Sequence, residues 1–222
     1  VFDDADIEEA VIGAMANKYR NSGQVCVSAN RIYVHENIHE EFSEKLAKKS
    51  SELKVSDGRV DGAQIGPLIT PEALGKVKEH VSDAVDKGAN ILTGGTNDNA
   101  GIQFYKPTVM TNVTNKMKIY YEETFGPVAP IIKFSSEDEV IKMANDTKYG
   151  LAGYFYSRDI GKIWRVAEAL EYGMIGINAG VISTEVAPFG GIKESGIGRE
   201  GAEEGIDEYL EIKYLCFDGI EK

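Results

Sequence analysis

Strand-like and helix-like segments alternate along almost the whole chain, and this alternation constrains the fold more than any other feature of the sequence. Apolar runs that favour strands occur at residues 31–34, 90–93, 108–110, 127–134, 152–157 and 174–178. Amphipathic stretches that favour helices lie between most of them. Because parallel strands need a crossover connection, usually a helix, this order predicts an α/β fold. We expect a mainly parallel open sheet with helices on both faces.

Side chains that can cap a helix stand at the start of each amphipathic stretch. The strongest start is Thr70, because Pro71 takes the first helical position and an acid follows; this helix should run to about Lys87 and end at Gly88. The other expected caps are Asp4 or Asp6, Asn37, Ser135 or Ser136, and Asp159.

Composition excludes several classes of partner. The net charge of −12 argues against binding to nucleic acid or to an anionic membrane. No apolar run approaches the roughly 18–20 residues needed to span a bilayer, and no signal peptide is visible. Cys26 and Cys216 are too few cysteines for a disulfide framework, so a cytoplasmic protein is expected. The chain starts with Val inside an apolar-acidic phrase, and we expect it to be part of a longer protein.

His35, Glu36 and His39 match the H-E-x-x-H pattern of zinc proteases. That chemistry needs both imidazoles on one helical face, with the glutamate beside the metal-bound water. Here His35 ends an expected strand and the helix is expected to begin near Asn37, so the two imidazoles should point in different directions. We therefore expect solvated histidines at a strand–helix junction and no metal site.

Residues 196–201 match the G-x-G-x-x-G pattern of dinucleotide-binding proteins. That loop must follow a hydrophobic strand and open a helix within a βαβ unit. The residues before it are polar and glycine-rich, and only a lone apolar run follows it. A structural glycine loop is the better interpretation.

Cys26 is the candidate nucleophile. A thiol with a pKa near 8.5 is only a few per cent thiolate at neutral pH, so a reactive cysteine needs a supporting environment. Converging backbone N–H groups would supply thiolate character and an N–H for a developing oxyanion. The alternative is a buried, inert cysteine, the commoner role of an isolated Cys.

Three separated motifs favour the reactive role. They are residues 22–26 (SGQVC), residues 122–127 (EETFGP) and residues 188–191 (PFGG) with 193–196 (KESG). In order and spacing they resemble the aldehyde dehydrogenase superfamily over essentially the whole chain. The phrases at residues 19–21 (YRN), 123–134, 151–157 and 163–167 are most similar to succinate-semialdehyde dehydrogenases.

The resemblance implies a role for four further residues. Cys26 would attack the aldehyde carbon to form a thiohemiacetal, whose carbon would lose a hydride to NAD or NADP and leave a thioester for hydrolysis. Glu123 corresponds to the acid that binds the nicotinamide ribose, and Phe125 to the aromatic residue beside it. Arg20 corresponds to an arginine that binds the substrate's far carboxylate, and Ser183 to a serine that assists it. A solvated Glu123, a helix-terminal cation at Arg20 and an ordinary loop serine at Ser183 remain the alternatives.

Two departures from the superfamily pattern matter. Ser28 replaces a second cysteine that some relatives carry, so no local redox switch is expected. The general-base glutamate, an oxyanion-hole asparagine and the Rossmann domain would lie before residue 1, so we expect the chain alone to be inactive. The resemblance implies a catalytic domain at residues 1–204 and an oligomerisation strand at residues 205–222.

The apolar, β-prone run at residues 209–217 has no helix after it. Such a strand can pair with another subunit or with its own sheet. We expect a homo-oligomer, a dimer or tetramer, that oxidises succinic semialdehyde. An aldehyde dehydrogenase for an uncharged aldehyde and a non-catalytic oligomerisation module are the alternatives.

Overall fold

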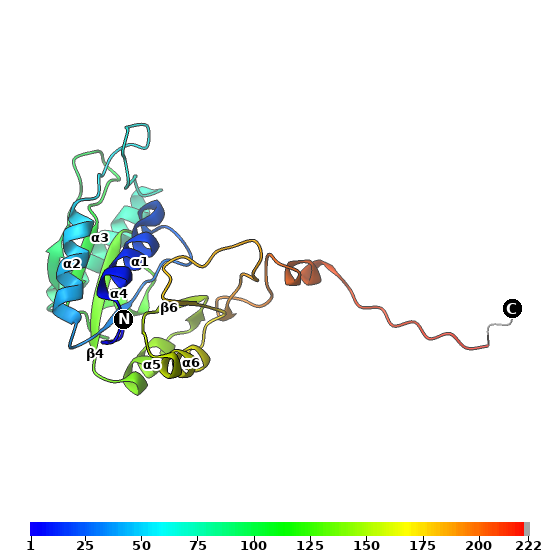
Figure 1. Cartoon of the computed structure of the whole chain (residues 1–222). Helices are drawn as coiled ribbons and strands as arrows, with labels where there is room; N and C mark the ends of the chain where they lie inside the picture. The colour runs from blue at the N-terminus through cyan, green and yellow to red at the C-terminus, as the bar shows by residue number, and fades with distance from the viewer. Residues whose placement is uncertain (220–222) are drawn as a thin grey trace.

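The structure, a computed structural model, describes residues 1–219: an α/β body and a C-terminal segment that leads away from it (Figure 1). The largest sheet has the order β1-β4-β3-β2. Its strands are β1 (Ile32–His35), β2 (Asn90–Thr93), β3 (Thr108–Thr111) and β4 (Val128–Phe134). Both β1 and β3 run parallel to β4, and β2 runs antiparallel to β3.

Two smaller strand pairs complete the described sheets. A parallel pair joins β6 (Ala152–Phe155) to β7 (Met174–Ile177), and an antiparallel pair joins β5 (Tyr149–Gly150) to β8 (Ile192–Lys193). The mainly parallel α/β class is therefore confirmed. The strands form one four-stranded sheet and two pairs.

Helices cover both faces of the four-stranded sheet. On one side, α1 (Ile7–Tyr19) and α2 (His39–Ser51) pack against Ala129 and Ile131 of β4. On the other, α3 (Pro71–Asp86) and α4 (Lys118–Tyr121) pack against Val128 and Ile132. Neighbouring residues of β4 thus face opposite layers, as the two-residue period of a strand requires. A third cluster joins Phe2 and the β4 end to α5 (Glu137–Asn145) and α6 (Ile160–Ala169).

Most predicted helix starts are confirmed. Asp6, Thr70, Ser136 and Asp159 each accept a hydrogen bond from a backbone N–H in the first turn. The prediction for Asn37 is wrong. Its backbone N–H lies 3.3 Å from His35 Nδ1 in a turn, and Ile38 occupies the N-cap position without a side-chain bond, so α2 begins at His39.

Val1 and Phe2 connect two of the sheets. The nitrogen of Val1 donates to the carbonyl of Tyr33, and His35 donates back to Val1, at 2.7 and 3.0 Å. The next N–H, that of Phe2, donates to Tyr156 just beyond β6 at 3.1 Å. The ring of Phe2 packs edge-on against two other rings of the third cluster. Two residues therefore hold β6 beside β1.

The C-terminal segment leaves the body after η2 (Glu204–Tyr209) (Figure 1). Residues 210–219 form no strand pair with the rest of the described chain. Their large apolar side chains are exposed: Leu210, Ile212, Tyr214, Leu215 and Phe217. Pairing with the chain's own sheets is thus not seen, and pairing with another subunit remains a prediction. Residues 220–222 of the expected oligomerisation strand lie outside the described residues. Across residues 1–219, no helix has the length and apolar character needed to span a bilayer.

Replacing Ile131 with Ala tests the central layer. Ile131 is fully buried in β4, so the truncation should lower the free energy of unfolding by about 2–5 kcal/mol through lost burial and a residual cavity. Ile102→Ala is the control, because that side chain is 86% exposed and its loss should change stability by no more than about 0.5 kcal/mol. Urea unfolding followed by circular dichroism measures both; equal effects would contradict the assigned core.

Candidate active site

A left-handed turn connects α1 to Cys26. Asn21, Ser22 and Gly23 have φ values of 49°, 59° and 75°, so three consecutive residues adopt a conformation that L side chains rarely take. Hydrogen bonds hold the turn: Ser22 Oγ donates to the carbonyl of Gly66 at 3.0 Å, and Asn21 Nδ2 to that of Gln24 at 3.0 Å. Strained backbone of this kind gathers at functional sites.

Gly23 brings this turn against a second segment. A β-carbon at Gly23 would lie 2.1 Å from the carbonyl oxygen of Gly126, far inside van der Waals contact. Only a glycine lets the two backbones approach this closely. The contact joins residues 22–26 to residues 122–127, two motifs that are distant in the sequence.

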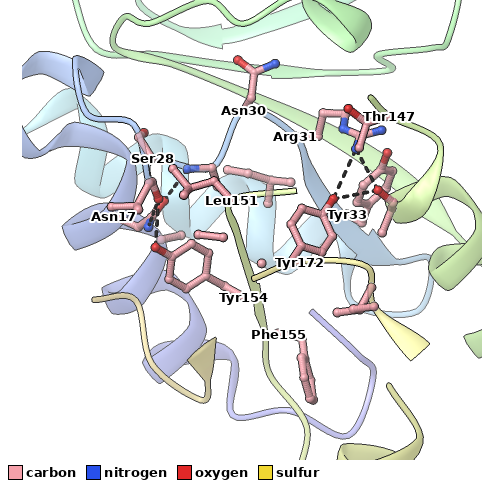
Figure 2. A pocket seen from close by; sticks show the side chains of 18 of the residues that line it. Asn17, Ser28, Asn30, Arg31, Tyr33, Thr147, Leu151, Tyr154, Phe155 and Tyr172 are labelled. Atoms are coloured by element: carbon pink, nitrogen blue, oxygen red, sulfur yellow. Dashed lines mark hydrogen bonds between the residues drawn. The ribbon is translucent and has the colours of Figure 1, made fainter. Parts of the chain in front are cut away.

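Two polar side chains, buried Asn17 and partly buried Tyr154, hold the loop on the other side of Cys26. Asn17 Nδ2 donates to the carbonyl of Val27 at 3.1 Å, and its Oδ1 accepts from the N–H of Ala29 at 2.6 Å. The hydroxyl of Tyr154 donates to the same Val27 carbonyl at 2.9 Å. Figure 2 shows Asn17 and Tyr154 converging beside Ser28. The side chain of Cys26 is exposed, so a fixed backbone presents a free thiol.

A cavity of about 450 Å³ opens beside Cys26, between edge strand β1 and β6 (Figure 2). Residues that line it include Asn17, Cys26, Asn30, Glu123 and Tyr154. The structure therefore places the candidate nucleophile and the candidate ribose-binding acid on one cavity.

The charge of Arg20 acts on Tyr154, which lines the cavity. Burial raises the pKa of Tyr154 to about 12, with a lowering contribution from its hydrogen bond to Asn17. The charge of Arg20 also lowers that pKa. Tyr154 thus lies within electrostatic reach of Arg20.

Asn30 fixes the segment that carries Glu123 and Phe125. Its Nδ2 donates to the carbonyl of Glu122 at 3.0 Å, and its Oδ1 accepts from the N–H of Thr124 at 2.9 Å. Glu123 and Phe125 are both exposed, and Phe125 has a φ of 50°. This segment, like the Cys26 loop, combines a held backbone with accessible side chains.

His80 supports the same segment from α3. Its Nδ1 lies 3.0 Å from Thr124 Oγ1, and its Nε2 lies 3.2 Å from a carboxylate oxygen of Glu122. Only 1% of His80 is exposed, and this burial lowers its pKa, although Glu122 acts in the opposite direction.

Arg20 and Ser183 are less closely tied to the cavity. Arg20 is the exposed C-cap of α1, and it forms no ion pair within residues 1–219. Ser183 is exposed in the loop after β7; this loop is anchored by a 3.0 Å bond from Asn17 Nδ2 to the carbonyl of Gly180. Neither residue lines the cavity, and nor does Phe125.

The residues that hold the site in place were not predicted from the sequence: Asn17, Lys18, Asn30, His80 and Tyr154. A signal existed for Lys18. It lies four residues after Ala14 and seven after Val11, on the apolar stripe of α1. A lysine at a buried helical position departs from the ordinary pattern.

The two literal motifs do not form the sites that their patterns describe. His35 ends β1 and His39 begins α2, and the described residues contain no group of three or more His, Cys, Asp or Glu that could hold a metal ion. The expectation that both histidines are solvated is wrong for His39, which is buried at the start of α2. Residues 196–201 form bends and irregular backbone, and Glu200 forms an isolated antiparallel bridge with Phe189. They do not connect a strand to a helix.

Comparisons with known proteins cover nearly the whole chain. The family model described as "Aldehyde dehydrogenase family" matches residues 1–215. The 3-sulfolactaldehyde dehydrogenase of Pseudomonas putida is 56% identical over 100% of this chain and 46% of its own length. Succinate-semialdehyde dehydrogenase GabD of Escherichia coli K12, whose name specifies NADP(+), is 54% identical over 97% of this chain and 45% of its own.

A solved structure also matches nearly the whole chain and less than half of its own length. The crystal structure of succinate-semialdehyde dehydrogenase from Burkholderia pseudomallei aligns with a TM-score of 0.97 and 58% identity, covering 98% of this chain and 45% of that one. The chain therefore spans about half the length of the relatives that it matches.

Gly23→Ala tests the contact between the two segments. The added methyl group meets the Gly126 carbonyl and forces a left-handed alanine, so the free energy of unfolding should fall by about 2 kcal/mol or more. Gly75→Ala is the matched control, because nothing lies near a β-carbon there and the site is inside α3; stability should rise by about 1 kcal/mol. Urea denaturation separates the two; a neutral Gly23→Ala variant would rule out the close approach.

Burial of His80 predicts a pH dependence of stability. Its pKa is lowered in the folded state, so the unfolded chain, with an ordinary pKa of 6.5, binds the proton first as pH falls. The stability contributed by neutral His80 is therefore full above pH 6.5 and is lost as pH falls below it, by at most about 1.4 kcal/mol per pH unit. His39 has a lowered pKa for the same reason.

Urea titrations between pH 7.5 and 5.5 measure this slope. His80→Gln and His39→Gln should each remove a separate share of it, since the residues lie on different helices. An unchanged slope in His80→Gln would show that His80 takes up its proton equally well in the folded chain.

Proposed function

Because the chain belongs to the aldehyde dehydrogenase family, we propose that it carries the cysteine-bearing half of an NAD(P)-dependent enzyme that oxidises succinic semialdehyde to succinate. One observation carries this proposal: the exposed thiol of Cys26 stands on a rigidly held loop and shares a cavity with Glu123. Residues 1–204 form the catalytic part in this proposal, and residues 205–222 form the oligomerisation strand.

Cys26 is the nucleophile of the proposed reaction. Its thiolate attacks the aldehyde carbon and forms a thiohemiacetal, and the backbone N–H of Cys26 stabilises the oxyanion. A bound nicotinamide cofactor, NAD or NADP, would supply the hydride acceptor, and loss of hydride from the thiohemiacetal carbon would leave a thioester on Cys26. Water then hydrolyses the thioester and releases the acid. The bonds from Asn17 and Tyr154 to the loop support this role, because they hold the nucleophile in place before substrate arrives.

Glu123 and Phe125 fit a bound nicotinamide nucleotide. A carboxylate accepts hydrogen bonds from two neighbouring hydroxyls, which a ribose supplies. Glu123 is exposed on the cavity, and the ring of Phe125 is accessible two residues later. Asn30 bonds to the backbone of this segment, and His80 bonds to the side chain of Thr124, which lies between Glu123 and Phe125.

Arg20 selects the substrate in this proposal. Its guanidinium is exposed, forms no ion pair among the described residues and lies within electrostatic reach of Tyr154. A planar guanidinium binds a carboxylate or sulfonate through paired N–H donors. The two curated relatives are named for aldehydes that carry such an anionic group, a sulfonate and a carboxylate. We assign Ser183 an assisting hydrogen bond to the same group.

The exposed apolar side chains at residues 210–217 support assembly into a homo-oligomer, a dimer or tetramer. An extended segment of this composition gains backbone and apolar contacts by pairing with another chain. Oligomerisation therefore accompanies the enzymatic role.

Arg20→Ala should raise KM for succinic semialdehyde at least about tenfold and leave butanal almost unaffected, because only the former offers a charge to the guanidinium. The measurement uses a chimaera that joins this chain to the part of the E. coli relative outside the matched region. A sulfonated aldehyde of the same length forms a third arm and distinguishes the two anionic substrate classes.

Three controls bound the result. Cys26→Ser should abolish oxidation, Cys216→Ser should not, and the 222-residue chain alone should produce no NADH or NADPH. Equal KM changes for succinic semialdehyde and butanal would assign Arg20 a structural role at the end of α1. An active Cys26→Ser chimaera would overturn the proposed function as a whole.

A further inference from the structure

Lys18 is a buried cation beneath the loop that carries Cys26. It lies in the last turn of α1, and only 2% of it is exposed. Its Nζ donates to the carbonyl of Ala29 at 3.0 Å, its one hydrogen bond within the described chain. An ammonium group has three donors, so most of its hydrogen-bonding capacity is not used by these residues.

This placement is unfavourable for stability alone. A buried ammonium without a hydrogen-bonded carboxylate has lost its hydration, and a well-packed apolar side chain of similar length would avoid that loss. Burial accordingly lowers the pKa of Lys18 to about 8, while the charge of Glu123 acts in the opposite direction. Groups perturbed in this way gather at functional sites.

Three hydrogen bonds between side chains of α1 and backbone groups hold the Cys26 loop. Asn17 holds the carbonyl of Val27 and the N–H of Ala29, and Lys18 holds the carbonyl of Ala29. The side chain of Ser28 does not contribute, because its buried hydroxyl has no hydrogen-bond partner among residues 1–219. The charge of Glu123 also acts on the charge of Lys18. Lys18 therefore interacts with the Cys26 loop and with residues 122–127.

We propose that Lys18 is a positioning residue, whose buried ammonium holds the Cys26 loop through Ala29 and orients the thiol toward the cavity that Glu123 shares. This inference rests on the proposed function, since it assumes that Cys26 is the nucleophile. The cationic group is retained for the geometry that its bond to Ala29 gives to the loop.

Alkylation of the 222-residue chain by iodoacetamide at neutral pH tests the inference. Peptide mass spectrometry follows Cys26 and Cys216 separately, and the exposed Cys216 in the C-terminal segment is an internal standard. In the unmodified chain Cys26 should react faster. Lys18→Met removes the donor and the charge at nearly constant volume, and should slow Cys26 about fivefold or more with no change at Cys216.

Two further variants separate positioning from folding. Lys18→Gln keeps an N–H donor without the charge and should restore part of the Cys26 rate. Lys78→Met removes an exposed lysine of α3 and should change nothing. The Tm of Lys18→Met should stay the same or rise, because a buried charge is replaced by an apolar side chain. A purely structural lysine would instead lower Tm and leave the rate ratio of the folded chain unchanged.

The possible failures are distinguishable. If Cys26 of the unmodified chain reacts no faster than Cys216, the assignment of the nucleophile fails. If Cys26 reacts faster and Lys18→Met leaves its rate unchanged, the positioning role of Lys18 is overturned. If Lys18→Met lowers Tm by more than about 5 °C, the Cys26 alkylation rate of Lys18→Gln is used in its place, and an unchanged rate overturns the positioning role.

Discussion

The close approach of Gly23 to Gly126 is the contact on which the site depends. A side chain at Gly23 would push the two backbones apart, and the turn before Cys26 would lose its support against residues 122–127. The approach also needs the left-handed conformation of Asn21 and Ser22, which directs the chain sharply away from α1. A short glycine contact thus sets how near the thiol stands to Glu123. The hydrogen bonds around Cys26 then hold the backbone of its loop in the position that this contact allows.

The site separates rigid backbone from accessible side chains. Asn17 and Tyr154 bond to the peptide groups after Cys26, and Asn30 bonds to those around Glu123. None of these three supplies the proposed chemistry. They satisfy buried backbone groups that would otherwise have no partner, and they leave the thiol and the carboxylate accessible. Amides and a phenol suit this task, because each forms directed bonds without placing a full charge in the interior.

Sequence patterns predicted those features that depend on residues close together in the chain, such as the helix starts. Thr70 and Asp159 cap helices because their oxygens bond to N–H groups three residues away, so the helix starts could be predicted without the rest of the chain. Asn37 was misassigned because His35 holds its N–H in a turn. Cys26 and Glu123 were found through separated motifs, and the structure places them on one cavity. The residues that hold them could not be predicted in the same way. Asn17 bonds to Gly180, 163 positions along the chain, and no local pattern encodes such a contact.

The connection between the sheets has a mechanical consequence. β6 has no ladder bonds to β1, and the backbone of Val1 and Phe2 bridges the space between them. Tyr154 stands on β6 and bonds to Val27, next to Cys26, whereas Asn17 bonds to the same carbonyl from α1. Sliding of the β6–β7 pair along β1 would therefore pull on one of the two side chains that share this carbonyl. A shear displacement between the sheets would thus reach Val27, the residue after Cys26. A force applied to β7 would in this way shift the thiol of Cys26.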